Sequence, residues 1–192
     1  MRMKNIISNI GGLLLCLQLL LVLHPSSAYA QEEKSYVRAI LIYKFIPFVS
    51  WGKNNFPNDG SEKHSICTIG YSDVSELLEM LAEKREKKNF VLFRDIKLED
   101  INNCNVLYVG NLSHMANKNK KEKDILKEIV SKSKIHHILT VSNLDGFIKN
   151  GGMIAFVERD DMLKFKISML AVEKAGLSLE AILLELAVKI YR

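Results

Sequence analysis

The chain has 192 residues, with 27 Lys and Arg against 22 Asp and Glu, which gives a formal net charge of +5. Hydrophobic residues make up 48% and charged residues 26%, the composition of an ordinary globular protein. These values exclude a disordered chain, a collagen-like chain and a small disulfide-dense scaffold. The length suits one domain.

The first 30 residues are predicted to be a secretory signal peptide. Arg2 and Lys4 precede an apolar stretch over 6–23, and the small-residue pattern Ala-Tyr-Ala follows at 28–30. This order of basic, apolar and A-x-A segments predicts cleavage after Ala30. A membrane anchor is the alternative, but the apolar stretch is near the lower limit for a span. We therefore expect an exported, soluble protein.

Cleavage would leave a mature domain over 31–192. Removing residues 1–30 takes away two basic residues and no acidic one, which leaves a net charge of +3. A domain of this charge outside the cytoplasm gives little reason to expect nucleic acid as a partner. Cys67 and Cys104 are the two cysteines that remain. An even number in an oxidising compartment favours a disulfide, and two buried free thiols are the alternative.

The opening segment of the mature chain predicts a helix over 36–51. Ala39, Ile42 and Phe45 recur there at helical spacing. Pro47 removes a backbone donor, so we expect a kink or a break near it. Strands and helices then alternate along the chain. The strands are expected over 65–70, 90–94, 105–109 and 136–141, and the helices over 73–84 and 121–131.

The last quarter of the chain predicts a hairpin and two helices. Strands over 153–157 and 163–167 are joined by Asp160 and Asp161, a pair that suits a hairpin turn. A short helix over 171–175 ends at a glycine, and a final helix is expected over 178–191. The predicted fold class is therefore α/β: a single three-layer domain with a mostly parallel, doubly wound sheet, an antiparallel hairpin at one edge and an apolar C-terminal helix.

This topology brings the two cysteines together. In the common doubly wound order, the first and third strands are neighbours. Cys67 lies near the start of the first strand, and Cys104 lies just before the third. A bond between them would close a loop of 38 residues and stabilise the fold by about 4 kcal/mol in the chain-entropy model. A structural role is expected, and a redox-sensing role would require an accessible or strained bond.

Motifs of catalysis and metal binding are absent from the sequence. It contains no G-x-S-x-G, H-E-x-x-H, G-x-x-x-x-G-K or G-x-G-x-x-G pattern. His136 and His137 adjoin on a predicted strand, so their side chains should point to opposite faces and not share a metal ion. We therefore predict no catalytic residue, no metal site and no cofactor.

One candidate binding site lies at the carboxyl ends of two neighbouring strands. Ligands of open α/β sheets bind there, where the strand order reverses. Ordinary turn chemistry is the alternative explanation for the glycines and small polar residues in both segments. The candidate ligand-binding residues are Gly70, Tyr71, Ser72, Asp73, Gly110, Asn111 and Ser113.

A second candidate surface is the predicted final helix. Apolar side chains occupy most of its circumference, whereas a surface helix normally has one apolar face. Either the helix is buried on most sides, or it forms a dimer or partner interface. The candidate interface residues are Leu179, Ile182, Leu183, Leu184, Leu186, Val188 and Tyr191.

Two stretches resemble the signatures of the YfiR-like family. Residues 38–51 read R-A-I-L-I-Y-K-F-I-P-F-V-S-W, similar to the family's opening helix K-A-x-x-I-Y-x-F-x-x-F-V-x-W. Residues 139–157 contain L-T-V-S, G-F, G-G-M-I and F-V in the order of its second signature. Both cysteines also fit the family pattern. Pro47 departs from it, because a small residue is common at that position.

The resemblance implies a function. YfiR-like proteins are periplasmic, and the namesake binds the periplasmic sensor domain of an inner-membrane diguanylate cyclase and holds it inactive. An outer-membrane lipoprotein can sequester that repressor, after which cyclic-di-GMP rises and favours biofilm. The resemblance therefore implies a non-catalytic repressor, with a homodimer as a further expectation because the namesake is dimeric.

Two other functions remain open. Family members also occur beside histidine kinases, so a periplasmic sensor of a small ligand at the strand-end crevice is one alternative. A secreted enzyme of unfamiliar type is another, and it would need a cleft with clustered titratable groups.

Overall fold

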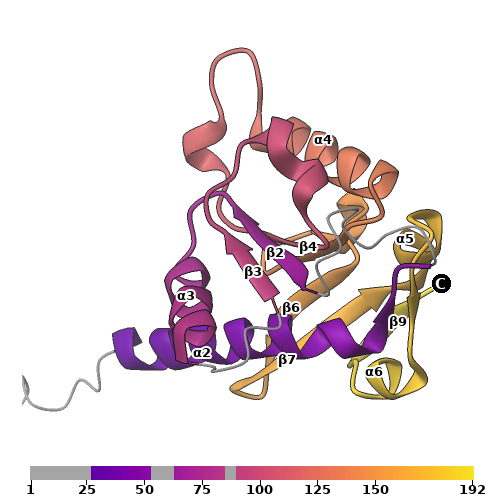
Figure 1. The fold of residues 1–192 in the computed structure, drawn as a ribbon. Helices are drawn as coiled ribbons and strands as arrows, with labels where there is room; N and C mark the ends of the chain where they lie inside the picture. Colours follow the sequence, from indigo (N-terminus) through magenta and orange to yellow (C-terminus); the bar gives the residue numbers. More distant parts are fainter. Residues whose placement is uncertain (1–26, 53–62, 85–89) are drawn as a thin grey trace, which may run out of the picture. The chain divides into compact units, whose positions relative to one another are not determined.

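The structure is a computed structural model that describes residues 27–52, 63–84 and 90–192. The chain divides into a first unit over 1–33 and a second unit over 34–192. The first unit's described residues, 27–33, belong to helix α2 (Ser27–Phe45). The predicted signal peptide lies outside the described residues except for its last four. The second unit contains the sheet and the elements that cover it (Figure 1).

A seven-stranded sheet forms the centre of this unit, in the order β3-β2-β4-β5-β6-β7-β9. The first five strands in this order are parallel, β7 is antiparallel to β6, and β9 is parallel to β7. This arrangement confirms the predicted α/β class. The strands are β2 (His64–Ile69), β3 (Phe90–Phe93), β4 (Val106–Val109), β5 (Leu139–Ser142), β6 (Ile154–Arg159), β7 (Met162–Ser168) and β9 (Lys189–Tyr191).

Helices cover both faces of the sheet. Helix α2 and helix α3 (Val74–Lys84) pack on one face, called the α2 face below. Helix α4 (Glu122–Ile135) and the 3₁₀ helix η2 (Leu98–Asn103) pack on the other, called the α4 face (Figure 1). The remaining elements are η1 (Ile46–Phe48), β1 (Val49–Ser50), η3 (Ser113–Met115), η4 (Ile148–Asn150), α5 (Met169–Lys174), β8 (Ser178–Leu179) and α6 (Ala181–Glu185).

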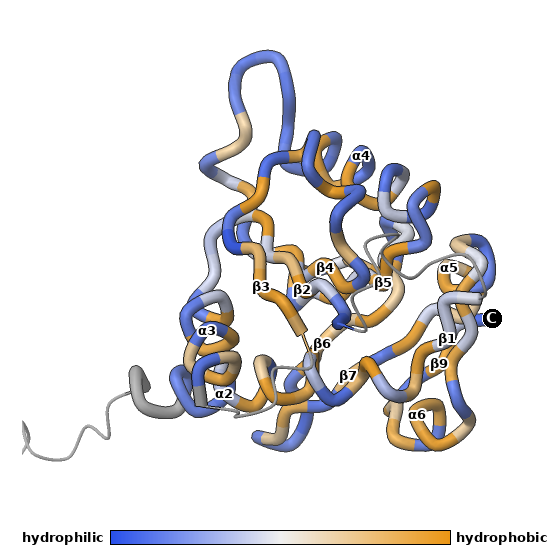
Figure 2. Tube along the Cα trace, viewed as in Figure 1, coloured by the Kyte–Doolittle hydropathy of each residue, from blue (hydrophilic) through white to orange (hydrophobic). Residues whose placement is uncertain are grey.

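The central strands are apolar on both sides because both of their faces are covered. On β4, Val106 and Tyr108 join the core beneath α2, whereas Leu107 and Val109 join the core beneath α4. This alternation follows from the two-residue period of a strand. Figure 2 shows the resulting concentration of hydrophobic residues along the inner strands.

The hairpin between β6 and β7 is confirmed, but it is not at the edge of the sheet. Asp160 and Asp161 both have positive φ, 53° and 57°, as a two-residue type I′ turn requires. Beyond the hairpin, β9 pairs with β7 through Lys166–Lys189 and Ile167–Ile190. The last strand therefore occupies the edge that the hairpin was expected to form.

The prediction of a single final helix over 178–191 is wrong. Residues 178–179 form strand β8, which pairs with β1 through Val49 and Leu179. Helix α6 has five residues, and the chain then enters β9. The segment is apolar on almost every side, so its pattern defines no single helical face. Pairing with β1 and β7 decides its structure, because tertiary contacts override a weak local preference.

Two further expectations have different outcomes. Helix α2 ends at Phe45 and Pro47 lies in the 3₁₀ turn that follows, so the predicted break is confirmed. The placement of His136 and His137 on a strand is wrong, because α4 extends to Ile135. His136 caps this helix, and His137 has a φ of 55°. The strand begins later because the helix continues one turn beyond its predicted end.

Candidate functional site

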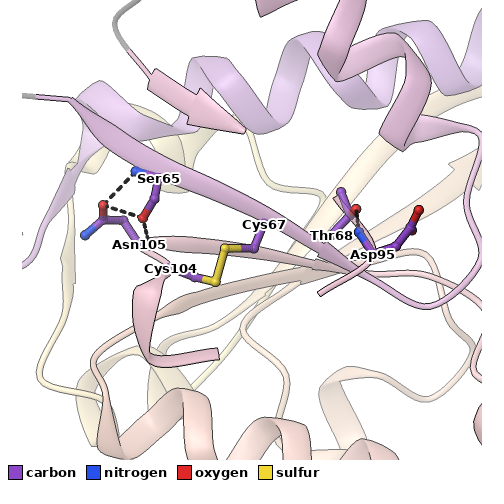
Figure 3. Close-up of a disulfide and its surroundings, with 6 residues drawn as sticks. All are labelled: Ser65, Cys67, Thr68, Asp95, Cys104 and Asn105. Carbon is purple, nitrogen blue, oxygen red and sulfur yellow. Dashed lines mark hydrogen bonds between the residues drawn. A yellow bond between two sulfur atoms is a disulfide. The ribbon is translucent and has the colours of Figure 1, made fainter. Parts of the chain in front are cut away.

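A disulfide joins Cys67 to Cys104, with 5.7 Å between the two Cα atoms (Figure 3). Cys67 is on β2, and Cys104 follows η2 just before β4. Because β2 and β4 are neighbours, the pairing predicted from the topology is confirmed. Both cysteines are buried in the core beneath α4, which favours a structural role over a readily reduced one.

The two segments of the predicted strand-end crevice lie directly against each other. The Tyr71 and Asn111 backbones exchange two N–H···O bonds, each 2.9 Å long. A Cβ atom on Gly110 would come within 2.4 Å of the Tyr71 carbonyl oxygen. The close approach of the two backbones therefore explains why position 110 is a glycine. It also leaves no room for a ligand between these two segments.

A pocket of about 820 Å³ opens beside this junction. Its lining includes four of the predicted ligand-binding residues, Gly70, Tyr71, Asn111 and Ser113, together with the segment 95–99 after β3.

The other three predicted residues are engaged elsewhere. Ser72 Oγ accepts a hydrogen bond from the Val74 amide, and the Asp73 carboxylate accepts one from the Ser35 hydroxyl. Gly110 lies in the backbone junction. The structure thus brings four of the seven predicted residues to one pocket and turns the other three away from it.

The C-terminal segment after Gly176 presents part of the predicted interface. Ile182 and Leu186 are exposed, at 51% and 62% of their surface, whereas Leu183 is buried in the core. Leu179, Leu184, Val188 and Tyr191 are half-buried, and all four lie on or beside β8, α6 and β9. The exposed part of this surface is therefore narrower than the predicted stripe.

A buried polar cluster lies beneath helix α2, and sequence reasoning did not single it out. Arg38 is 4% exposed, and its Nη1 donates to Ser35 Oγ over 3.1 Å. The Ser35 hydroxyl in turn donates to Asp73 at the start of α3. The Tyr108 hydroxyl donates to Asn143 Oδ1 over 2.9 Å. This cluster brings α2, β4 and the segments after β2 and β5 together.

Two pKa values are shifted here, that of Tyr108 in the cluster and that of Glu158 beside it. Burial of the phenol raises the pKa of Tyr108 to about 12. The Arg38 charge and a hydrogen bond with Ser72 oppose this rise, and the Asp73 charge adds to it. The hydrogen bond from Lys34, with help from the charges of Lys34 and Arg38, lowers the pKa of Glu158. Glu158 therefore remains a carboxylate beside these two cations.

A sequence signal for the cluster did exist. Arg38 lies on the same helical face as Ala39, Ile42 and Phe45, which are all buried. A charged residue on an apolar stripe predicts either a buried ion pair or a polar site, because burying an unpaired charge is costly.

Two features are absent from the described residues. No group of three or more His, Cys, Asp or Glu side chains among them is placed to hold a metal ion. Within the same residues, no helix is both long and apolar enough to cross a bilayer.

Comparison with solved structures finds similar chains, of which one supports the fold. One similar structure is a conserved domain protein from Vibrio cholerae, with a TM-score of 0.51 and 13% identity over 81% of this chain. This chain spans 60% of the length of that structure. Another is an ABC domain in complex with L-Trp from Streptococcus pneumonia, with a TM-score of 0.46 and 10% identity, covering 81% of this chain and 61% of that one.

Comparison with curated proteins gives no match. A family model, in contrast, matches residues 35–188, which include both cysteines, helix α2 and nearly the whole sheet. The family is described as YfiR/HmsC-like, and its proteins are periplasmic, regulatory and non-catalytic, acting in cyclic-di-GMP signalling. Because the match extends over most of the chain, the resemblance found in the sequence is confirmed: the chain belongs to the YfiR/HmsC-like family.

Proposed function

We propose that this protein binds the periplasmic domain of an inner-membrane diguanylate cyclase and holds the cyclase inactive, lowering cyclic-di-GMP. The family match over residues 35–188 carries this proposal. Repression follows if the protein binds the inactive state of the cyclase more tightly than the active state, in proportion to that difference in affinity. An outer-membrane lipoprotein that sequesters the protein would reverse it. A signal peptide over 1–30, cleaved after Ala30, would deliver the protein to the periplasm.

The contact surface is proposed to centre on helix α6. Ile182 and Leu186 lie one helical turn apart and are both exposed, so they can enter one hydrophobic pocket of a partner. Leu179, Leu184, Val188 and Tyr191 would surround them. Leu183 supports this surface from the core. The same surface could serve a homodimer.

The test measures cyclic-di-GMP in a strain that lacks the protein, in the wild type and in complemented strains. We expect a rise in the deletion strain that wild-type protein reverses. An Ile182→Asp/Leu186→Asp variant should not reverse it, because two charges would enter the apolar contact. An Ile135→Asp variant is the matched control, since Ile135 is 67% exposed at the end of α4.

Immunoblots of the periplasmic fraction must show equal amounts of every variant. An unchanged cyclic-di-GMP level in the deletion strain would overturn repression of a cyclase. Full complementation by the Ile182→Asp/Leu186→Asp variant would instead overturn only the choice of surface.

The pocket at the strand ends favours a second candidate function, a small-ligand sensor acting with a histidine kinase or another receptor. Its volume of about 820 Å³ is in the range of ligand sites, and Gly70, Tyr71, Asn111 and Ser113 supply polar groups. A ligand of this pocket would raise the melting temperature in a saturable way. A Ser113→Trp variant, which would fill the pocket, should abolish that rise.

A further inference from the structure

Three lysines lie together on the α4 face of the sheet. Side chains alternate between the two faces of a strand, so Lys164 and Lys166 on β7 point away from Phe165, which is in the core beneath α2. Lys189 on β9 pairs with Lys166, and it therefore lies on the same side of the sheet. These three residues are called the lysine face below.

Helix α4 does not cover this part of the sheet. The strand residues in the core beneath α4 come from β2, β4 and β6, and none of the described residues of β7 or β9 takes part. In Figure 1, α4 lies near β4 and away from β7 and β9. Lys189 is exposed, and Lys164 and Lys166 are half-buried. Their ammonium groups reach solvent, because a lysine lays its apolar stem on the protein and keeps its charged end in water.

The three lysines repel one another. Neighbouring strands lie about 4.8 Å apart, and like charges placed directly opposite each other destabilise a sheet, as Lys166 and Lys189 are placed here. Within the described part of the chain, none of the three forms an ion pair. Lys189 Nζ lies 4.7 Å from the centre of the Tyr191 ring instead. A cluster of like charges with no internal counter-ion is suited to an external anion.

Other charged side chains around the lysine face cancel in pairs. The two turn aspartates lie at the far end of the hairpin, where Arg159 pairs with Asp160 over 3.6 Å. Asp145 and Lys149 both line a hollow of about 620 Å³ that Lys166 also lines. The charges of the three lysines therefore remain uncompensated.

The composition of this surface favours an anionic bilayer over an acidic protein. Protein interfaces are depleted in lysine and enriched in arginine and aromatic residues. Lysine clusters, in contrast, attract anionic lipid headgroups, and each lysine strengthens binding about fivefold. Met162 is exposed on the same side of β7, and Leu170 is exposed just beyond the other end of this strand. Both apolar side chains can enter the headgroup layer.

We propose that the lysine face docks the protein on a bilayer rich in anionic phospholipid, with the three ammonium groups against lipid phosphates. Helix α6 stays free in this arrangement, because Leu183 anchors it in the core beneath α2, on the other side of the sheet. The protein can therefore lie on a membrane and still present Ile182 and Leu186 to a receptor. The proposal does not rest on repression of a cyclase.

The experiment measures co-sedimentation of the disulfide-bonded protein with sucrose-loaded vesicles. It uses residues 31–192, which omit the predicted signal peptide and include the whole second unit. Vesicles of equal parts phosphatidylglycerol and phosphatidylethanolamine should bind the protein, and vesicles of phosphatidylcholine alone should not. Raising the salt from about 0.1 M to about 0.5 M should abolish binding, because salt screens exposed charges.

Variants assign the binding to the lysine face. Lys164→Gln/Lys166→Gln/Lys189→Gln should bind about a hundredfold more weakly, from about fivefold for each lysine. The triple Lys→Arg variant at the same positions keeps the charges and should bind as the wild type does. Circular dichroism checks that each variant folds. If the triple Gln variant fails to fold, the exposed Lys189→Gln alone should still weaken binding about fivefold.

A matched control separates the lysine face from net charge. Lys118→Gln/Lys121→Gln/Lys123→Gln removes the same charge from exposed lysines in the loop before α4 and in its first turn. This variant should bind nearly as the wild type does.

Several outcomes would overturn the proposal. Equal binding to phosphatidylcholine, undiminished binding by the triple Gln variant, or an equal loss in the control variant would each do so. Tighter binding to polyglutamate than to the vesicles would assign the lysine face to an acidic protein. Displacement by inorganic phosphate at matched ionic strength would assign it to a soluble phosphate. Repression of a cyclase is measured separately, by cyclic-di-GMP, and stands or falls independently.

Discussion

Leu107 and Tyr108 are neighbours on strand β4, yet they point into two different interiors. Leu107 enters the α4 face, where apolar side chains and the Cys67–Cys104 disulfide form the contacts. Tyr108 enters the α2 face, where a buried arginine and a chain of hydrogen bonds lie among the apolar residues.

The two faces differ in what their contacts contribute, stability on the α4 face and the precise placement of polar groups on the α2 face. The α4 face gains stability from the burial of apolar side chains and from a covalent bond. Its packed side chains tolerate little loss of volume. The α2 face holds polar groups whose partners must stand at set distances and angles, so it fixes the positions of particular side chains. We therefore expect damage to the α4 face to lower the free energy of unfolding more than damage to the α2 face.

Removal of the disulfide is expected to have the largest effect. A Cys67→Ala/Cys104→Ala variant should lose about 4 kcal/mol of unfolding free energy, because its unfolded chain is no longer closed into a loop. Urea denaturation followed by circular dichroism measures the loss. Reduced wild-type protein is the control and should match the variant. Equal stability of oxidised wild type and variant would show that the α4 face does not depend on its cross-link.

Truncation of Leu107 comes next. Leu107→Ala should cost about 3 kcal/mol, since the side chain is fully buried and its loss leaves a cavity in a packed core. The same denaturation assay applies. Leu170→Ala is the control, because Leu170 is 49% exposed and should change stability little. A similar loss in both variants would mean that the α4 face is loosely packed.

On the opposite face, Tyr108→Phe should cost about 2 kcal/mol, because it removes the hydrogen bonds of the hydroxyl with Asn143 and Ser72 and keeps the ring. The pKa of Tyr108 in the folded protein is raised to about 12, above the usual value for tyrosine. The unfolded state therefore loses its proton first, and this group's contribution to stability declines from about pH 10 to about pH 12.

Spectroscopic titration of tyrosinate measures this effect directly. The wild type should show one tyrosine that ionises late, and Tyr108→Phe should lack it. A loss above about 3 kcal/mol would mean that the polar face matters to stability as much as the apolar one.

The smallest effect is expected at His64, which packs against Trp51 with 4.9 Å between ring centroids. Burial lowers the pKa of His64, so the unfolded state takes up a proton before the folded state does. Stability should fall as the pH drops below about 6.5, by less than about 1 kcal/mol because the ring is only half-buried. A His64→Gln variant should lose this part of the pH dependence. An identical pH profile in both proteins would contradict it.

Much of the fold was predictable from residue patterns. The first four strands, helices α3 and α4 and the disulfide follow from alternating apolar runs and from the rule that places the first and third strands side by side. The adjacent pair Asp160 and Asp161 predicted the hairpin turn, because aspartate adopts a positive φ more readily than most residues other than glycine.

The C-terminal segment was not predictable in the same way. Ile182 and Leu186 fit a long helix as well as they fit α6, and pairing with β1 and β7 decides between these structures. The polar cluster beneath α2 was also missed. Arg38 and Tyr108 are far apart in sequence, and only the tertiary structure shows that Nε of the buried guanidinium has no hydrogen-bond partner among the described residues.

The disulfide has a consequence for how the chain can be cut. Helix α3 and strand β3 both lie between Cys67 and Cys104 in the sequence. A protease that cleaves one peptide bond in this interval therefore yields two polypeptides that remain covalently joined across β2 and β4. Such a nicked protein would migrate as a single species in a non-reducing gel and separate into two bands after reduction. The sheet would keep the pairing of β2 with β4, so the cross-link preserves the architecture after a single cut.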